Sequence, residues 1–414
     1  MFKRKTNILS MVEFLIKTFI LFCFIYEFVP VFVPSPIFSS RKIGFVIVLL
    51  YFIFKGYSVK PFFRNKYFKS IAIITGISIL YSFLLMQLNN GSGEYVIVWY
   101  VFFIAYAILG TILFVGFFNW DYDKLIKSIA VVTLCQAIWC ILTYYVDGIR
   151  LLNSTFFVVS EDENVDFLTM SRLRSIGAAG AGLSVRLALS SFSFLYFLIK
   201  QKYVVFCSAS LVLCFFATFL SGTTGVLIFL LALPVSLYLM MYGRRGGLTS
   251  SLLIVVPLFY FYVNSSAFFD DSQYEDLTYK LTSLLMDKGE DRTIHALTTD
   301  QVVSGISQTT IIGTGLSRGK TMSGEKCYHD GGYVRNYFGL GLVMSIVFYC
   351  VLYRAMYRQS KCLTRSIRYL LFIYILVCMI IEFKEPFMFS YIPLFVFQIL
   401  VLAERQELLT QKNC

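Results

Sequence analysis

Charged residues are scarce in this sequence of 414 residues: they make up 14% of the chain, whereas a soluble domain carries about a quarter. The sequence also lacks a phosphate-binding glycine loop, a dinucleotide-binding glycine pattern and the elbow motif of serine hydrolases. Its ten cysteines fall mostly within apolar runs and show neither a disulfide framework nor the spacing of metal ligands. We therefore expect a protein outside the common soluble enzyme classes, with no metal and no cofactor.

Hydrophobic residues are correspondingly abundant. They make up 58% of the chain, the mean hydropathy is +0.73, and apolar runs long enough to cross a bilayer recur from end to end. This pattern predicts an all-α polytopic membrane protein with about 12 transmembrane helices. The first apolar run is expected to remain as a span, because it is too long for the apolar part of a cleavable signal. The spans are predicted near residues 18–33, 43–56, 70–88, 95–118, 126–146, 183–199, 203–220, 226–242, 249–264, 338–357, 369–383 and 387–403.

The distribution of Lys and Arg predicts the orientation of these spans. Most of the 36 basic residues lie in loops that share one side if there are about twelve spans, and basic residues accumulate in cytoplasmic loops. The net charge of +12 is explained in this way without nucleic acid as a partner. Both termini are thus expected in the cytoplasm, and the loops 147–182 and 264–337 on the outer side. The chain then divides into spans one to nine (1–263), a large and mostly helical outer loop (264–337), and the last three spans with a cytoplasmic tail (338–414).

Four arginines in or near the outer loops are candidate ligands for an anion. Arg186 lies inside a predicted span, where an arginine costs about 3 kcal/mol to insert and is therefore a functional candidate. In the structural explanation, the Arg186 side chain extends to the membrane interface or pairs with an acid that has no role in function. Arg172, Arg174 and Arg292 lie in the loops, where most arginines are solvated. The guanidinium fork binds phosphate through two hydrogen bonds and stays charged, so arginines gathered at an outer surface would suit a lipid-linked pyrophosphate.

A second set of candidates precedes the tenth predicted span. His329 could take a proton from a sugar hydroxyl as a neutral imidazole, and ordinary hydrogen bonding in a loop is an equal alternative. Asp330 is placed to cap the helix that follows, and a carboxylate used as a cap is a poor base. Tyr333 and Arg335 project from the first turns of that helix, whose start is a potential anion site.

The candidate residues belong to short motifs that occur in a definite order. A multi-span frame carries an arginine motif in its first outer loop, and a larger outer loop closes with a histidine motif just before a span. The motifs are Arg174-Ser175-Ile176-Gly177-Ala178-Ala179-Gly180, Asp291-Arg292-Thr293-Ile294-His295, Ile312-Gly313-Thr314-Gly315 and His329-Asp330-Gly331-Gly332-Tyr333-Val334-Arg335. This order resembles the O-antigen polymerases (Wzy type), within the wider superfamily of O-antigen polymerases and ligases. The likeness of architecture covers nearly the whole chain, and its specificity rests on the order and spacing of the motifs.

The resemblance implies an activity and a location. Such enzymes act at the periplasmic face of the bacterial inner membrane. There they transfer a growing polysaccharide from undecaprenyl pyrophosphate to an incoming lipid-linked repeat unit, and undecaprenyl pyrophosphate leaves. They use neither a nucleotide sugar nor a metal. The implied partners are undecaprenyl-pyrophosphate-linked oligosaccharides, membrane lipid and a protein that regulates chain length.

The resemblance also implies roles for individual residues. His329 would activate the acceptor hydroxyl, or Asp330 would orient it. The turn at Gly313–Gly315 would shape the groove for the sugar. The implied ligands of the donor pyrophosphate are Arg186, Arg292 and either Arg174 or Arg172.

Two other functions are compatible with this architecture. An O-antigen ligase, which transfers the polymer to the lipid A core, shares the closing histidine region, but the residues after its histidine usually differ from the Asp-Gly-Gly-Tyr found here. A flippase for lipid-linked oligosaccharides would place charges along a cavity at mid-membrane depth and would show sequence repeats, which we do not find. We therefore favour a polymerase, which is an enzyme of the glycosyltransferase class.

Overall fold

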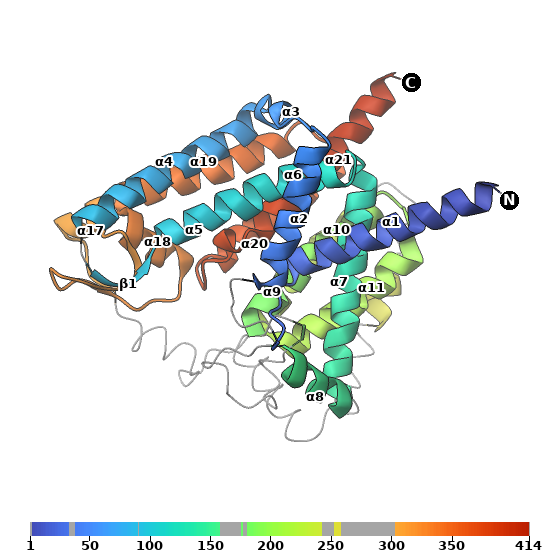
Figure 1. Cartoon of the computed structure of the whole chain (residues 1–414), viewed down its shortest axis with the longest axis horizontal. Coiled ribbons are helices and arrows are strands. Elements are labelled where there is room, and N and C mark those ends of the chain that lie inside the picture. The colour runs from blue at the N-terminus through green and yellow to red at the C-terminus, as the bar shows by residue number, and fades with distance from the viewer. Residues whose placement is uncertain are drawn as a thin grey trace.

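The computed structural model describes residues 2–32, 38–89, 91–157, 175–176, 180–241, 252–257 and 303–413. These residues are mostly helical, with one small sheet toward one end of the molecule (Figure 1). The helices are α1 (Phe2–Ile25), α2 (Ser40–Phe54), α3 (Lys60–Phe63), α4 (Lys66–Leu88), α5 (Ile97–Phe102), the π-helix η2 (Phe103–Leu109), α6 (Gly110–Phe117), α7 (Tyr122–Tyr145), α8 (Asp147–Phe156), α9 (Gly180–Ser190), α10 (Phe192–Ile199), α11 (Val204–Ser221), α12 (Thr223–Met241), α17 (Gln308–Ile312), α18 (Gly332–Leu340), α19 (Leu342–Ser360), α20 (Arg365–Ile381), the 3-10 helix η6 (Phe387–Ser390) and α21 (Ile392–Asn413).

Within the described residues, five helices are long and apolar enough to cross a membrane. The helix α7 shows why such a segment is helical. The Asp121 side chain accepts a hydrogen bond from the Lys124 amide at 3.0 Å and caps its start, and no glycine or proline interrupts it before Tyr145. The five helices confirm the expected class of helical membrane protein, while the total of about 12 spans stays a prediction. They are Lys66–Leu88, Ile97–Phe117, Tyr122–Tyr145, Gly180–Ile199 and Val204–Ser221.

Two predicted span boundaries are wrong, and each has a local cause. The first span was expected at 18–33, but α1 ends at Ile25. The chain after it is extended, because the Val31 amide donates to the Phe156 carbonyl at 2.9 Å, a pairing that a helix cannot make. The span expected at 338–357 is divided at Gly341, whose φ of +80° separates α18 from α19. The span expected at 249–264 lies mostly outside the described residues.

Some of the loops predicted to share one side of the membrane are in contact in the fold. In Figure 1 both termini lie at the upper right, whereas the sheet lies at the left and α8 at the bottom, away from the termini. At the end with the termini, the Asn65 side chain donates to Gln359 at 3.4 Å and so joins two basic loops. At the opposite end, the turn after α1 pairs with the end of α8. The orientation of the spans stays a prediction.

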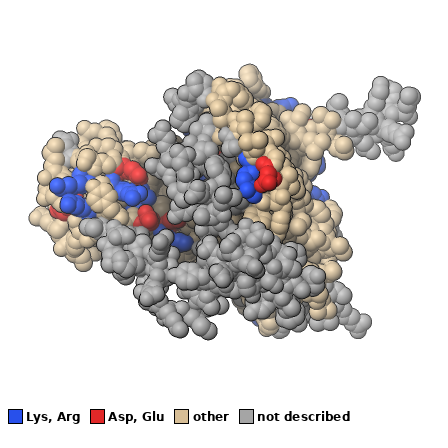
Figure 2. Space-filling view, turned by 90° about the horizontal axis from the view of Figure 1, so that it is seen from below, with Lys and Arg blue, Asp and Glu red and all other residues tan. Residues whose placement is uncertain are grey.

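The described part of the large outer loop, 303–337, differs from the mostly helical loop that we expected. It contains β2 (Leu316–Thr321) and β3 (Lys326–Cys327), and β1 (Gly91–Tyr95) completes an antiparallel sheet in the order β1-β2-β3. Gly93 and Gly319 face each other across β1 and β2, and a Cβ atom on either would collide with the opposing backbone. In the space-filling view, basic and acidic side chains gather at the left, over this sheet (Figure 2).

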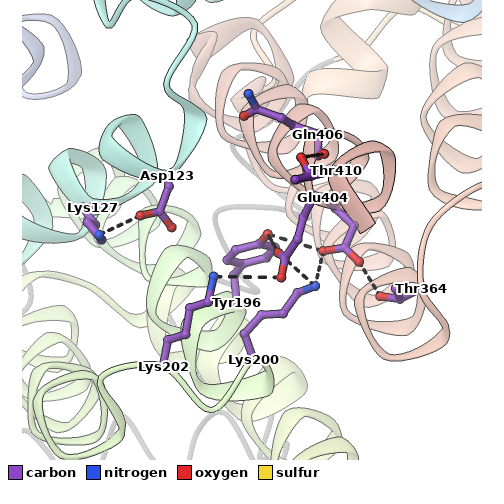
Figure 3. Close-up of polar contacts among 10 residues, drawn as sticks. Asp123, Lys127, Tyr196, Lys200, Lys202, Thr364, Glu404, Gln406 and Thr410 are labelled. Carbon is purple, nitrogen blue, oxygen red and sulfur yellow. Dashed lines mark hydrogen bonds and ion pairs between the residues drawn. The ribbon is translucent and has the colours of Figure 1, made fainter. Parts of the chain in front are cut away.

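A buried carboxylate joins three segments on the side of the termini (Figure 3). Glu404 on α21 is fully buried. One of its oxygens lies 2.6 Å from Lys200 Nζ, and the other accepts a hydrogen bond from Thr364 Oγ1 at 2.6 Å. The Tyr196 hydroxyl lies 3.4 Å from the same carboxylate. Because a buried carboxylate is stable only with its charge paired and its oxygens hydrogen-bonded, this cluster fixes α21 against the end of α10 and the start of α20.

Removal of this carboxylate is expected to destabilise the protein. Glu404→Ala removes the fully buried partner of the mostly buried Lys200 ammonium and leaves it only the partly exposed Glu407. We expect a loss of about 3–5 kcal/mol in the free energy of unfolding. The matched control is Glu407→Ala, because Glu407 Oε2 lies 3.2 Å from the same ammonium but is 31% exposed. We expect it to lose about 1 kcal/mol or less. Unfolding in detergent micelles measures both losses, and equal losses would contradict the role given to burial.

Candidate functional site

The described residues contain seven of the ten predicted site residues. Arg172, Arg174 and Arg292 lie outside them. The others fall into two groups on the side opposite the termini. One group is Arg186 on α9, and the other comprises Gly313, Gly315, His329, Asp330, Tyr333 and Arg335, which lie in or beside α18 and the sheet.

Arg186 lies in the second turn of α9, inside a helix that can cross the membrane. Its side chain is partly exposed. Its Nη1 donates to the Ile25 carbonyl at 3.5 Å, which is a long hydrogen bond. Among the described residues, no carboxylate forms an ion pair with it. An arginine inside an apolar span without an acidic partner is a strong candidate for binding an anion.

A second arginine, which sequence reasoning did not select, lies close to Arg186. Arg41 is at the start of α2 and forms an ion pair with Glu27. Its guanidinium carbon lies 5.0 Å from the ring centroids of both Tyr106 and Tyr391. Its only sequence signal was its place in a short outer loop, where basic residues are few.

Arg41 and Arg186 are connected through the last residues of α1. The Tyr391 hydroxyl donates to the Phe24 carbonyl at 2.6 Å and lies 3.5 Å from the Ile25 carbonyl, the group that Arg186 also contacts. Arg186 lies near enough for its positive charge to contribute to lowering the pKa of Arg41, although the burial of Arg41 is the larger cause. The sequence does not show this proximity, since the residues come from helices far apart along the chain.

His329 is held in a defined orientation before α18. Its Nδ1 accepts a hydrogen bond from the Gly331 amide at 2.8 Å, so the neutral ring carries its proton on Nε2. Partial burial lowers the pKa of His329, and the nearby Asp330 charge offsets part of that effect. In this conformation the imidazole presents a donor, and it can accept a proton at Nδ1 only after the Gly331 amide is released.

The expectation that Asp330 caps the following helix is wrong. The N-cap residue of α18 is Gly331, and no side chain caps this helix. The reason is a tertiary contact: the Gly332 amide, one of the first in the helix, donates to the Glu382 carbonyl at 2.8 Å. A backbone carbonyl from a distant segment thus satisfies a donor that a capping side chain would otherwise satisfy.

Tyr333 and Arg335 are both held by protein contacts. The Tyr333 hydroxyl lies 3.1 Å from the Met379 carbonyl and its ring packs edge-on against Phe383. Arg335 is buried, pairs with Glu94 on β1 and stacks over Trp99, with its guanidinium carbon 4.5 Å from the ring centroid. These contacts attach α18 to α20 and to the sheet.

The glycines of the predicted sugar-binding turn also have a structural basis. Gly313 and Gly315 have φ values of +112° and +79°, which favour glycine. A Cβ atom on Gly313 would lie 2.5 Å from the Leu340 carbonyl carbon, and the Gly315 amide donates to the Gly339 carbonyl at 2.9 Å. The turn is therefore packed against the end of α18.

A short segment between α20 and α21 links the two groups of candidate residues. At its start, the fully buried Glu382 holds the first turn of α18 through its carbonyl. At its end, Tyr391 lies beneath Arg41. Within the described residues, no hydrogen bond joins Arg186 directly to His329. The sequence further predicts that Arg174, Arg186, Arg292 and His329 line one cavity at the outer surface. This stays a prediction, because Arg174 and Arg292 lie outside the described residues.

Comparisons with protein-family models, curated proteins and solved structures find no match for this chain. Within the part of the chain that the structure describes, no group of three or more His, Cys, Asp or Glu side chains is placed to hold a metal ion. The site is therefore characterised by its own residues, which are an arginine pair between helices and a histidine before α18.

The partial burial of His329 leads to a prediction about the pH at which it titrates. The chain has two histidines, so His295→Gln leaves one imidazole signal in histidine-labelled NMR spectra. We expect that signal to titrate below pH 6.5, because burial disfavours the charged form. The unfolded chain then binds the proton more readily, so this residue's contribution to stability is present above pH 6.5 and is lost as the pH falls below it. A midpoint at or above 6.5 would contradict this environment.

Proposed function

We propose that this chain is a polysaccharide polymerase of the O-antigen (Wzy) type. It transfers a growing chain from undecaprenyl pyrophosphate to an incoming lipid-linked repeat unit. The observation that supports this most directly is Arg186, a cation inside an apolar span whose described partner is one backbone carbonyl. Such a group favours an anionic ligand that itself belongs to the membrane, and a lipid-linked pyrophosphate has both properties.

The reaction assigns a role to each group of residues. The acceptor hydroxyl attacks the anomeric carbon of the donor sugar, the bond from that carbon to the pyrophosphate oxygen breaks, and the pyrophosphate leaves with the electron pair. Arg186, together with loop arginines Arg172, Arg174 and Arg292, stabilises the charge that develops on the leaving group. His329 receives the proton of the hydroxyl after its Nδ1 exchanges the Gly331 amide for the acceptor.

The proposal includes a location and partners. The chain lies in the bacterial inner membrane with both termini in the cytoplasm, so that the sheet and α18 face the periplasm. This placement follows the side on which the basic loops gather, at the end with the termini. Its substrates are undecaprenyl-pyrophosphate-linked oligosaccharides, and a chain-length regulator acts with it.

Deletion of the gene tests this function against its alternatives. A strain without the polymerase should make lipopolysaccharide that bears a single repeat unit, because export and ligation continue. Loss of every repeat unit would instead indicate a flippase or a ligase. An unchanged ladder of chain lengths on a lipopolysaccharide gel would contradict all three functions.

Point variants in the complemented strain test the arginine chemistry. Arg186→Ala and Arg292→Ala should each lower polymerisation by about a hundredfold to a thousandfold, which removes the ladder, while membrane abundance stays unchanged. Lys320→Ala is the control, because Lys320 is an exposed base on β2 on the same side of the molecule. We expect a normal ladder from the control. A full ladder from Arg186→Ala would exclude arginine-assisted departure at this position.

A further inference from the structure

We propose that Arg41 and Arg186 together bind the phosphate groups of a prenyl pyrophosphate, which displaces the Glu27 carboxylate from Arg41. This inference rests on the proposed function and extends it to a residue that the sequence motifs do not contain. The site lies between the start of α2, the second turn of α9 and the end of α1, with Tyr106 and Tyr391 as its aromatic wall.

The first support is the balance of charge. Arg41 and Arg186 place two positive charges in one neighbourhood, and Glu27 supplies one negative charge by pairing with Arg41. Two like charges near each other destabilise a fold unless an anion lies between them. A pyrophosphate carries enough negative charge to neutralise both arginines at once.

The second support is the geometry of Arg41. Its guanidinium lies against two tyrosine rings, at 5.0 Å from each centroid, and stacking on aromatic rings holds the flat guanidinium in place. Among the described residues, its Nε is buried and has no hydrogen-bond partner. A buried donor without an acceptor is costly in a protein interior, and a phosphate oxygen is an acceptor of the right charge.

The third support is the accessibility of the ion pair. The side chains of Arg41 and Glu27 are 18% and 20% exposed, so neither is sealed in the core. In contrast, the Glu404 side chain, which pairs with Lys200, is fully buried, with 0% of its surface accessible to solvent. A partly exposed carboxylate can move aside for a competing anion, and the outcome depends on which anion forms the stronger hydrogen bonds with the guanidinium.

Binding to the full-length protein in nanodiscs tests the inference. Farnesyl pyrophosphate is the probe, and farnesol shows how much of the affinity comes from the prenyl tail alone. Arg41→Ala should weaken binding of the pyrophosphate by about tenfold to a hundredfold, since it removes a charge-assisted pair of hydrogen bonds. Arg41→Lys should give an intermediate loss, because lysine keeps the charge but not the fork or the stacking.

Glu27→Gln separates a binding role of Arg41 from a purely structural one. If the carboxylate competes with the phosphate, its removal should tighten binding by about fivefold, the effect of one partly exposed ion pair. If Arg41 only serves to pair with Glu27, the variant should leave binding unchanged. Lys320→Ala is the matched control and should bind as the wild type does. Unfolding temperatures of all variants show whether each one is folded.

The outcomes distinguish this inference from the proposed function. Normal binding by folded Arg41→Ala, together with weak binding by Arg186→Ala, would overturn the two-arginine site and leave the polymerase proposal intact. Absence of pyrophosphate binding by the wild type would overturn both. Displacement of the probe when phosphatidylglycerol replaces phosphatidylcholine in the nanodiscs would show a general phospholipid site and would also overturn the assignment to a pyrophosphate.

Discussion

The burial of the Glu382 carboxylate is the constraint on which the site side of the molecule depends. A carboxylate with 0% exposure is tolerated only where its oxygens are hydrogen-bonded. Here the Tyr349 hydroxyl donates to one oxygen at 2.6 Å and the Met388 amide donates to the other at 2.8 Å. These bonds fix the turn between α20 and α21, and the Glu382 carbonyl fixes the start of α18. A side chain on Gly332 would collide with the carboxylate, which explains a glycine there.

The described arginines on this side fall into two kinds, and the difference decides what each can do. Arg335 is buried against Trp99 with the Glu94 carboxylate as its counter-charge, so its role is to hold α18 to the sheet. Arg186 has one long hydrogen bond to a carbonyl. Arg41 pairs with a single acid, Glu27, and lies near the positive charge of Arg186. The neutralised arginine stabilises the fold, whereas the pair with excess positive charge is suited to a ligand.

The sheet shows how the site is held in place from a distance. Its strands β1 and β2 come from the loop after α4 and from the large outer loop, and they place Glu94 beside Arg335. On the other side of the molecule, Glu404 joins α21 to the turns that follow α10 and α19. Carboxylates therefore help to fix both ends of the bundle, the exposed Glu94 at the sheet and the buried Glu404 at the other end, and each has partners from separate segments.

The sequence by itself determined the helical membrane class and singled out Arg186 as an unusual cation. These features depend on local composition, because hydropathy and basic residues act on each segment separately. The tertiary structure decided that Arg41 joins Arg186, that Glu94 neutralises Arg335, and that a backbone carbonyl replaces Asp330 as the cap of α18. Each of these depends on a contact between residues far apart in the chain, and no periodicity or spacing records such a contact.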